Sequence, residues 1–343
     1  MKSRFFGKAG CHSILLDGVT MVGAIMLSET DNFQDGTSMT PIFKFEGIYT
    51  PIVTPYRDDG NMNWDALANL IDFLIEKGVH GLISGGSTGE NYAQTVEERL
   101  QTARFVKDQV KGRLPLVVGT GAMLTEDSIA LAKGARELDA DAILLASPPY
   151  SVPTDRENAL NALAIDKAAN LPVMLYNYPH RTGTMMGEEF LDRVGRSRNF
   201  CGIKESSGDI NRVHLLARDY PHITLGCGMD DQALEFFAWG APFWVCGGSN
   251  FLPEEHIALY EACILQGDFA KGQRIMAAML PLMRVLEQGG KFIQTIKHGV
   301  TMTGIEAGSV RPPLTNLNKD DKRSLEQVLR ILKTTIAAIR AED

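Results

Sequence analysis

Short apolar runs alternate with amphipathic stretches along the chain from Gly47 onward, without a break in composition that would mark a linker. The apolar runs are almost unbroken instead of alternating with polar residues, as expected of strands buried on both faces of a parallel sheet. This pattern predicts eight strands. Their ranges are Gly47–Pro51, Gly81–Ser84, Leu116–Gly119, Ala142–Ala146, Val173–Asn177, Cys201–Lys204, Ile223–Gly226 and Phe243–Cys246.

Helical patterns with their own start signals fill the segments between these runs. Thr95 with Glu98, and Thr154 with Glu157, have the spacing of a capping box, in which the side chains satisfy backbone N–H groups at a helix start. Each unit of strand, loop and helix spans roughly 20–35 residues, the repeat length of a parallel βαβ crossover. Eight such units predict an α/β fold closed into a (β/α)8 barrel, because an open sheet leaves edges that need protection. An open doubly wound sheet is the alternative.

Three further helical patterns follow the eighth unit, over Phe269–Leu286, Phe292–Met302 and Ser324–Ile339. The last one places five aliphatic side chains on one face, and such a helix is too apolar to stand alone in water. We therefore expect a C-terminal helical extension packed on the barrel. The predicted organisation is an extension over residues 1–45, a catalytic barrel over 46–252, and the last barrel helix with a helical appendix over 253–343.

The first 45 residues do not fit the repeating pattern. A basic start and the semi-apolar segment Ser13–Leu27 superficially resemble a signal peptide, but Asp17 and Gly18 interrupt that segment. No run in the chain approaches the roughly 18 apolar residues of a membrane span. We interpret this part as a poorly ordered extension, or as the result of a start assigned too far upstream, with Met39 as the initiator.

Composition and charge narrow the classes of function. The chain has 343 residues, of which 44% are hydrophobic and 22% charged, so a folded protein is expected instead of a disordered one. With 34 Lys and Arg against 42 Asp and Glu, the formal net charge is −8. Nucleic acids and anionic membrane surfaces are therefore not expected as partners. The length fits either two domains or one barrel with additions.

Neither a metal nor a cofactor is predicted. The five cysteines include no Cys-x-x-Cys pair, and the seven histidines include no His-x-His or His-x-x-x-His pair. Widely spaced cysteines in odd number also argue against a disulfide framework and favour a cytoplasmic location. Asp230 and Asp231 are adjacent at a predicted helix start, where we interpret them as capping residues. No Walker-type loop occurs, and Gly119-Thr120-Gly121 lacks the rest of a dinucleotide fingerprint.

Lys204 is the sharpest candidate for chemistry. Active sites of (β/α)8 barrels lie at the C-terminal ends of the strands, and Lys204 closes an apolar run. Desolvation favours the neutral form of an amine, and a neutral amine is a nucleophile toward ketones. Lys204 is therefore a candidate for Schiff-base formation. The alternative is a lysine at the rim that pairs with Glu205 or Glu90.

Other candidates follow the ends of further strands. Tyr176 ends the neighbouring strand and its hydroxyl can shuttle protons, although a tyrosine can equally fill the top of a barrel. Around Gly86, exposed backbone N–H groups and the hydroxyls of Ser87 and Thr88 suit a small carboxylate. The loop after the eighth strand adds two candidates for binding a phosphate or carboxylate, Gly248 and Ser249.

Several motifs occur in a fixed order along the chain. They are Tyr49-Thr50-Pro51 with Thr54-Pro55, Gly86-Ser87-Thr88-Gly89-Glu90, Tyr176-Asn177-Tyr178-Pro179 with Arg181-Thr182-Gly183, Gly202-Ile203-Lys204-Glu205-Ser206-Ser207-Gly208, and Val310-Arg311-Pro312-Pro313-Leu314. Together they resemble the dihydrodipicolinate synthase / N-acetylneuraminate lyase family of class I, Schiff-base aldolases. The resemblance covers roughly Phe45 to Ile339, and it implies a (β/α)8 barrel with a C-terminal helical extension.

The resemblance also implies a role for each candidate. It implies that Lys204 binds the keto carbon of pyruvate or a related 2-oxo acid, and that Tyr176 donates and accepts protons beside it. Ser87 and Thr88 would hold the carboxylate, with the Ser87 hydroxyl relaying protons to Tyr176. Tyr150 matches a tyrosine that family members contribute to the neighbouring subunit's site. The implied assembly is a homotetramer built from two tight dimers.

The resemblance leaves the second substrate open. Arg181 matches an arginine that synthases use near the carboxylate of the aldehyde, whereas Ser87 replaces the threonine typical of synthases. We expect a Schiff-base lyase or synthase acting on pyruvate and an aldehyde, most like a 4-hydroxy-tetrahydrodipicolinate (dihydrodipicolinate) synthase. The alternatives are a catabolic aldolase of the N-acetylneuraminate or 2-keto-3-deoxy acid type, a dehydratase-deaminase of a 2-oxo acid or cyclic imine, and a ligand-binding barrel without catalysis.

Overall fold

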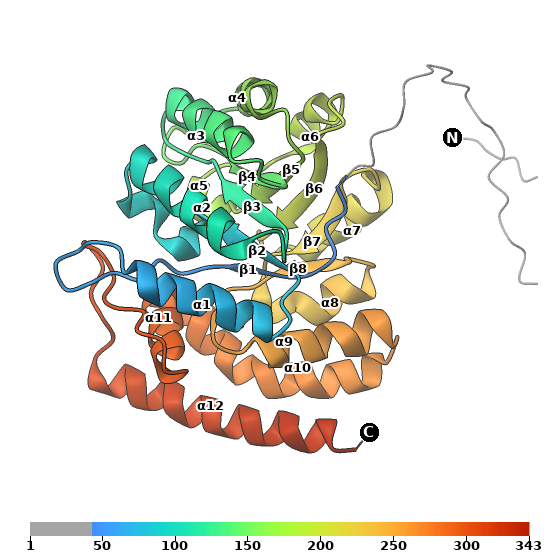
Figure 1. Ribbon diagram of the computed structural model, residues 1–343. Coiled ribbons are helices and arrows are strands. Elements are labelled where there is room, and N and C mark those ends of the chain that lie inside the picture. The colour runs from blue at the N-terminus through green and yellow to red at the C-terminus, as the bar shows by residue number, and fades with distance from the viewer. Residues whose placement is uncertain (1–42, 343) are drawn as a thin grey trace, which may run out of the picture. The chain divides into compact units, whose positions relative to one another are not determined.

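Eight short strands follow one another around a closed parallel barrel in their order along the chain (Figure 1). The computed structural model describes residues 43–342. Pairing of the first strand with the last closes the barrel, so the predicted (β/α)8 fold is confirmed and the open sheet is wrong. The strands are β1 Gly47–Pro51, β2 Gly81–Ser84, β3 Leu116–Gly119, β4 Ala142–Ala146, β5 Val173–Asn177, β6 Phe200–Glu205, β7 Thr224–Cys227 and β8 Phe243–Val245.

The first five strands have the predicted bounds, and the last three differ from the prediction by one residue at one or both ends. β6 is longer at both ends, β7 begins and ends one residue later, and β8 ends one residue earlier. The longer β6 places Tyr176 beside Lys204 and Asn177 beside Glu205 in the register of β5 and β6. The candidate lysine and tyrosine are therefore neighbours across two hydrogen-bonded strands.

Helices cover the outside of the barrel, as the alternating pattern predicts (Figure 1). Both predicted capping boxes are present, Thr95 with Glu98 and Thr154 with Glu157, so these residues fix the starts of two helices. The barrel helices are α1 Trp64–Glu76, α2 Val96–Val110, α3 Thr125–Glu137, α4 Asp155–Ala169, α5 Pro179–Thr182, α6 Glu188–Val194, α7 Ile210–Asp219, α8 Ala233–Ala238 and α9 Pro253–Tyr260.

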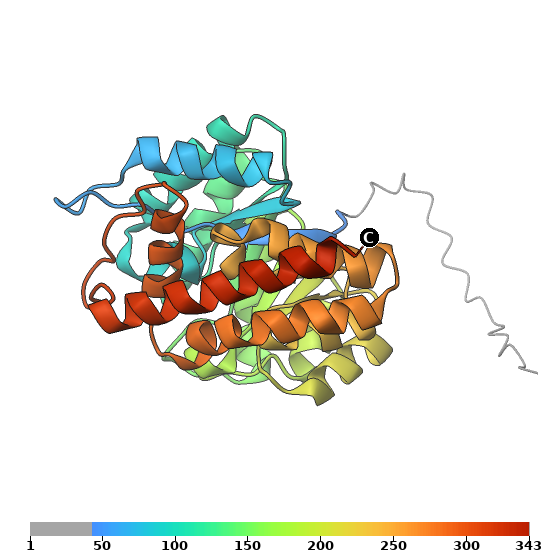
Figure 2. The ribbon, with the colours of Figure 1, turned by 90° about the horizontal axis from the view of Figure 1, so that it is seen from below.

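The C-terminal part of the chain forms α10 Phe269–Met283, α11 Phe292–Met302 and α12 Lys319–Arg340. α12 lies along α10 and also contacts α11 (Figures 1 and 2). α12 begins at Lys319 instead of Ser324, because the Asn318 side chain caps its first turn. α10 ends before the predicted Leu286, and the chain continues as the π-helical turn η6, Arg284–Gln288.

The predicted signal-like segment and Met39 lie outside the described residues, as does all but the end of the extension over 1–45. The division of the rest at residue 252 stays a prediction, with α9 beginning at Pro253. No helix within residues 43–342 is long and apolar enough to span a membrane. Four of the five cysteines fall in this range, and each of these is buried with a free thiol.

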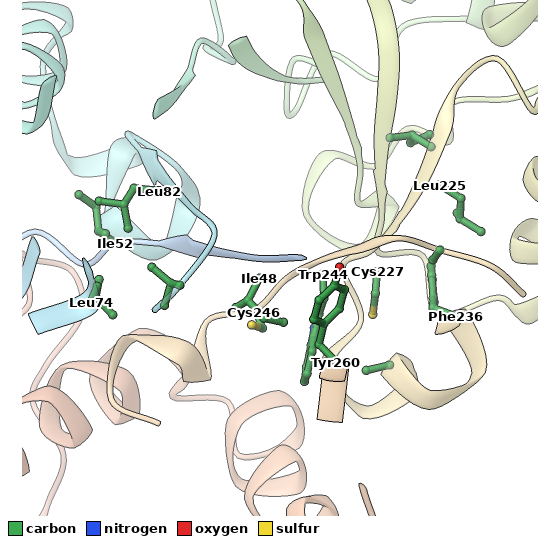
Figure 3. Close-up of a cluster of buried hydrophobic side chains, with 14 of the residues drawn as sticks. Ile48, Ile52, Leu74, Leu82, Leu225, Cys227, Phe236, Trp244, Cys246 and Tyr260 are labelled. Atoms are coloured by element: carbon green, nitrogen blue, oxygen red, sulfur yellow. The ribbon is translucent and has the colours of Figure 1, made fainter. Parts of the chain in front are cut away.

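Buried side chains between the strands and the outer helices form the larger part of the core. Figure 3 shows a section of this layer, where side chains of β1 and β8 meet Phe236 of α8 and Tyr260 of α9. Trp244 of β8 is fully buried there, and its Nε1–H donates a 2.9 Å hydrogen bond to Asp230 Oδ1. The outer core therefore holds a carboxylate that follows the end of β7.

Aromatic rings fill the inside of the barrel. The ring centroid of Phe45 lies 5.9 Å from that of Tyr49 and 5.5 Å from that of Phe243. These rings fit because neighbouring strands carry glycine at their level, as at Gly226, where a Cβ atom would lie 2.0 Å from Phe243 Cζ. Large residues on some strands and glycine on others thus close the barrel below its C-terminal end.

Substituting Gly226→Ala tests this packing. The added methyl group would overlap the Phe243 ring, and overpacking of this kind lowers the free energy of unfolding by about 1–3 kcal/mol. Urea denaturation of the purified protein measures the change. The double variant Gly226→Ala/Phe243→Leu should recover part of the loss, because the smaller side chain makes room for the methyl group. An Ala variant as stable as the parent would contradict the account.

Candidate active site

A cavity of about 360 Å³ lies at the C-terminal end of the barrel. Five of the residues singled out from the sequence line it together. They are Ser87, Thr88, Tyr176, Arg181 and Lys204. Because they come from four separate segments of the chain, only the closed barrel brings them to one place. A second cavity of about 570 Å³ adjoins the first and shares Ser87, Tyr176 and Arg181 with it, and Gly86 lines this second cavity.

Lys204 is almost buried, with 8% of its surface exposed. Its Nζ lies 4.2 Å from the centroid of the Tyr176 ring. Gly228 comes directly after β7 and packs against the lysine stem. A Cβ atom at this position would lie 2.6 Å from Lys204 Cγ. The lysine is therefore held between an aromatic ring and a backbone segment, with its amine in the cavity.

The alternative of a paired rim lysine is not what the structure shows. Glu205 accepts hydrogen bonds from Asn177 Nδ2 at 2.8 Å and from the Ser207 backbone N–H at 2.7 Å, and Arg212 Nε lies 3.6 Å from it. Glu90 is paired elsewhere. Within the described range, no carboxylate lies at ion-pair distance from Lys204. Its amine is thus available to a ligand in the cavity.

Ser87 and Thr88 belong to the short turn η1, Ser87–Gly89, which follows β2. Thr88 is buried, and Ser87 is partly exposed to the cavity. The turn is tight because Gly89 approaches Ile52 O so closely that a Cβ atom would lie 2.9 Å from this oxygen. Hydroxyl groups in such a turn suit a small carboxylate, and this role of Ser87 and Thr88 stays a prediction.

Glu90 anchors this turn to the C-terminal part of the chain. Its Oε1 accepts a 2.8 Å hydrogen bond from Lys297 Nζ of α11, and its Oε2 accepts one of 2.8 Å from the Arg311 backbone N–H. Both cations also lie over the Tyr56 ring, at 4.4 Å for Lys297 Nζ and 4.3 Å for Arg311 Cζ. Glu90 has φ 61°, a left-handed conformation that a non-glycine residue holds only when its surroundings fix it.

Arg181 lies on α5, directly after β5 and its loop. The side chain is exposed, and its guanidinium carbon lies 5.5 Å from the centroid of the Tyr178 ring. It can therefore meet a charged group that enters either cavity from solvent.

Four predicted site residues do not line the lysine cavity, and one of them, Gly86, lines the second cavity instead. Tyr150 is 89% exposed and lies outside both cavities. The Ser249 hydroxyl is buried and bonds to Thr50 Oγ1 and Cys246 O, both at 2.7 Å, while Gly248 packs against His256. The structure assigns the contact of this loop with the cavity to Gly247 instead of Gly248 or Ser249.

Two acidic residues in the cavity wall were missed as site residues from the sequence. Asp230, interpreted as a capping residue, lines the cavity instead, and burial raises its pKa to about 6. Glu287 lies on the π-helical turn η6, and burial raises its pKa to about 8, with a further contribution from Asp230. The position of Asp230 just after the end of β7 could have indicated a site residue, because active sites of such barrels lie at the C-terminal ends of the strands. Nothing in the local sequence pointed to Glu287, because its position depends on η6.

The described residues contain no candidate metal site. Across residues 43–342, no three His, Cys, Asp or Glu side chains gather in a way that could hold an ion. The expectation that the reaction needs no cofactor stays a prediction.

A buried lysine and a turn with two hydroxyl groups, brought together at the C-terminal end of a (β/α)8 barrel, define the class of the site, that of an enzyme active site. Comparison with known proteins agrees with this class. The family model described as the dihydrodipicolinate synthetase family matches residues 44–332. The chain belongs to this family, and it is an enzyme of the class I, Schiff-base aldolase/lyase type.

Individual relatives are similar over nearly their whole length. The 4-hydroxy-tetrahydrodipicolinate synthase of Pseudomonas aeruginosa is 33% identical over 289 residues, which are 83% of this chain and 97% of the relative. A solved structure of the synthase from Methylacidiphilum fumariolicum has 29% identity and a TM-score of 0.83, covering 87% of this chain and 99% of that one. A prophage protein of the family from E. coli K12, solved in complex with pyruvate, has 31% identity and a TM-score of 0.79, covering 84% and 99%.

Substituting Lys297→Met tests the anchor of the Ser87 turn. It leaves the Glu90 carboxylate buried without its cation, and removing one partner of a buried pair lowers the free energy of unfolding by about 3–5 kcal/mol. Chemical denaturation measures the loss, and the KM for pyruvate should rise because the turn loses its anchor.

The double variant Lys297→Met/Glu90→Gln should recover much of this stability, since no buried charge remains. Lys291→Met is the matched control, because its pair with Asp321 is partly exposed and should contribute less than about 1 kcal/mol. Equal losses in Lys297→Met and Lys291→Met would refute the special role of the buried pair.

Proposed function

We propose that this enzyme joins pyruvate, or a related 2-oxo acid, to an aldehyde through a Schiff base on Lys204, as a 4-hydroxy-tetrahydrodipicolinate synthase-like lyase. One observation carries the proposal. Lys204 is almost buried, has no paired carboxylate, and directs its amine into the cavity lined by Ser87 and Thr88. The relatives named as synthases and the pyruvate complex of a family member support the choice of substrates.

The proposed reaction begins when the lone pair of the neutral Lys204 amine adds to the keto carbon of pyruvate. The former carbonyl oxygen takes up a proton, and loss of water from this carbinolamine leaves an iminium cation. Removal of a proton from C3 gives an enamine, whose electron pair forms the new carbon–carbon bond to the aldehyde carbon. The aldehyde oxygen gains a proton, and water then hydrolyses the iminium and releases Lys204. The reverse order cleaves the bond.

Protons for these steps would pass through hydroxyl groups. Tyr176 is next to Lys204 in the strand register, and Ser87 lines the same cavity, so both are suited to a relay. Tyr150 would complete the relay from a second copy of the chain, which is compatible with its exposure of 89%. The homotetramer of two tight dimers and the cytoplasmic location belong to the same proposal.

A second candidate function uses the same Schiff base in degradation. It is a catabolic aldolase for sugar acids, or a dehydratase-deaminase of a 2-oxo acid. Ser87 in place of the threonine typical of synthases favours it, and so do the carboxyl groups of Asp230 and Glu287 in the cavity wall.

Reduction with borohydride in the presence of pyruvate tests the Schiff base. The expected result is a pyruvate adduct on the peptide that contains Lys204, identified by mass spectrometry, and no adduct in Lys204→Ala. Lys133→Ala is the matched control, because Lys133 is exposed on α3 and should leave the adduct unchanged. A Lys204→Ala protein that still forms the adduct, or a parent protein that forms none, would defeat the proposal.

Substituting Arg181→Ala tests whether the aldehyde carries an acidic group. Losing a charge-assisted hydrogen bond to a carboxylate should raise the KM for aspartate semialdehyde about tenfold or more, while the pyruvate adduct stays intact. Arg181→Lys keeps the positive charge, so its KM for aspartate semialdehyde should lie between those of the parent protein and Arg181→Ala. An unchanged KM in Arg181→Ala would contradict an acidic group on the aldehyde. Failure of the parent gene to complement a diaminopimelate auxotroph would count against aspartate semialdehyde as the substrate.

A further inference from the structure

A buried carboxylate follows the candidate lysine and is directed away from the cavity. Glu205 ends β6 directly after Lys204, and successive side chains of a strand point to opposite faces. Glu205 is 1% exposed and lines neither cavity. Its two oxygens accept hydrogen bonds from Asn177 Nδ2 at 3.0 and 2.8 Å, and Arg212 of α7 supplies the opposite charge, with Nε at 3.6 Å. The carboxylate therefore belongs to a buried network outside the barrel strands.

The same network holds the segment that carries Arg181. Asn177 Oδ1 accepts a 3.0 Å hydrogen bond from the Met186 backbone N–H, and Arg212 Nη2 donates one of 2.7 Å to Met186 O. Residues 178–186, called the arginine loop below, thus leave β5 at Asn177 and return to its side chain. Both ends of the loop are fixed by one set of buried polar groups.

Hydrogen bonds within the arginine loop keep its shape. The Thr182 hydroxyl donates to Thr184 O at 3.1 Å, and the Gly183 N–H donates to Pro179 O at 2.8 Å. Arg181 forms no ion pair with a carboxylate of the described residues, and only the Tyr178 ring of the same loop lies under its guanidinium. The place of Arg181 relative to Lys204 therefore depends on how the loop is attached to β5 and β6.

We propose that Asn177 and Glu205 are positioning residues for Arg181, and that they set the distance at which the carboxylate of the second substrate is bound from Lys204. The inference rests on the function proposed above and deepens it, because it names the groups that build the site for an acidic aldehyde. Neither side chain lines a cavity, so both act through the arginine loop. Lys204, Ser87 and Thr88, the residues proposed to bind pyruvate, lie outside this loop.

Substituting Asn177→Leu removes the donor to Glu205 and the acceptor for Met186 N–H while keeping a side chain of similar size. The KM for aspartate semialdehyde should rise about tenfold, as in Arg181→Ala, because the arginine loop loses its attachment. The KM for pyruvate and the yield of the borohydride-reduced adduct should change less than about twofold. A residue that only stabilises the barrel would affect both substrates alike.

Asn199→Leu is the matched control. Asn199 Nδ2 also donates to a buried carboxylate, Asp166 Oδ1, at 2.7 Å, but Asn199 precedes β6 and so lies at the opposite end of the strand from Lys204. This variant loses the same kind of hydrogen bond. Both of its KM values should equal those of the parent.

The double variant Asn177→Leu/Arg181→Ala tests whether the network acts through the arginine. Once Arg181 is absent, a displaced loop has no further effect on the carboxylate of the aldehyde. The KM for aspartate semialdehyde should therefore stay within about threefold of that in Arg181→Ala, whereas independent effects would multiply to about a hundredfold over the parent.

Exchanging the two polar groups keeps the inference testable if Asn177→Leu does not fold. In Glu205→Gln two amides face each other, and in Asn177→Asp two carboxylates do, so each change should raise the KM for aspartate semialdehyde about tenfold. In Asn177→Asp/Glu205→Gln the new amide donates to the new carboxylate, which still accepts from Met186 N–H and leaves one negative charge near Arg212. This double variant should return to within about threefold of the parent.

The outcomes separate this inference from the proposed function. If the parent forms no borohydride-reducible pyruvate adduct, the proposed function fails. The inference alone is overturned if the adduct forms but the parent does not use aspartate semialdehyde, or if Asn177→Leu raises both KM values equally. It is also overturned if the effects of Asn177→Leu and Arg181→Ala multiply, or if the exchanged pair is no better than its single variants.

Discussion

The buried ion pair between Glu90 and Lys297 joins the barrel to its C-terminal helices. The side chains of these residues are 0% and 3% exposed, so neither charge is stabilised by water. A buried charge is unfavourable by several kcal/mol unless its partner and further hydrogen bonds are in place, and here Arg311 N–H and Ser309 O supply them. The turn with Ser87 and Thr88 therefore keeps its shape only when α11 and the segment after it are docked. The helical appendix is part of the active site in this sense, although its residues follow the barrel in sequence.

A second constraint comes from inside the barrel. Lys204 is opposite Gly226 in the register of β6 and β7, and the Phe243 ring occupies the space that a side chain at Gly226 would need. Gly228, two residues further on, packs against the lysine stem. The two glycines thus leave room for the Phe243 ring inside the barrel and for the stem of Lys204 above it. The lysine is therefore held by the Tyr176 ring and the Gly228 backbone instead of by a salt bridge.

The parts of this architecture that depend on local sequence could be predicted, and the parts that depend on long-range packing could not. The bounds of the first five strands and the capping boxes at Thr95 and Thr154 follow from neighbouring residues, and Lys204 was singled out as a candidate because it closes an apolar run. The early start of α12 was missed because the signal is a single cap, Asn318. Glu287 was missed because it lies on a π-helical turn, η6, that the sequence pattern does not predict. Gly248 and Ser249 were assigned to the cavity, whereas Gly247 lines it, because the fine geometry of a glycine-rich loop cannot be derived from composition.

Charge acts on two length scales in this enzyme. The formal net charge of −8 disfavours polyanions, but at physiological salt surface charges are screened within about 8 Å. Inside the cavity the local groups dominate. Burial raises the pKa of Asp230 to about 6, while the hydrogen bond from Trp244 and the positive charge of Lys204 act in the opposite direction. A negative charge on Asp230 would stabilise the cationic iminium of the proposed Schiff base. An acidic protein can therefore bind an anionic substrate and stabilise a cationic intermediate, because a few buried groups outweigh the screened surface.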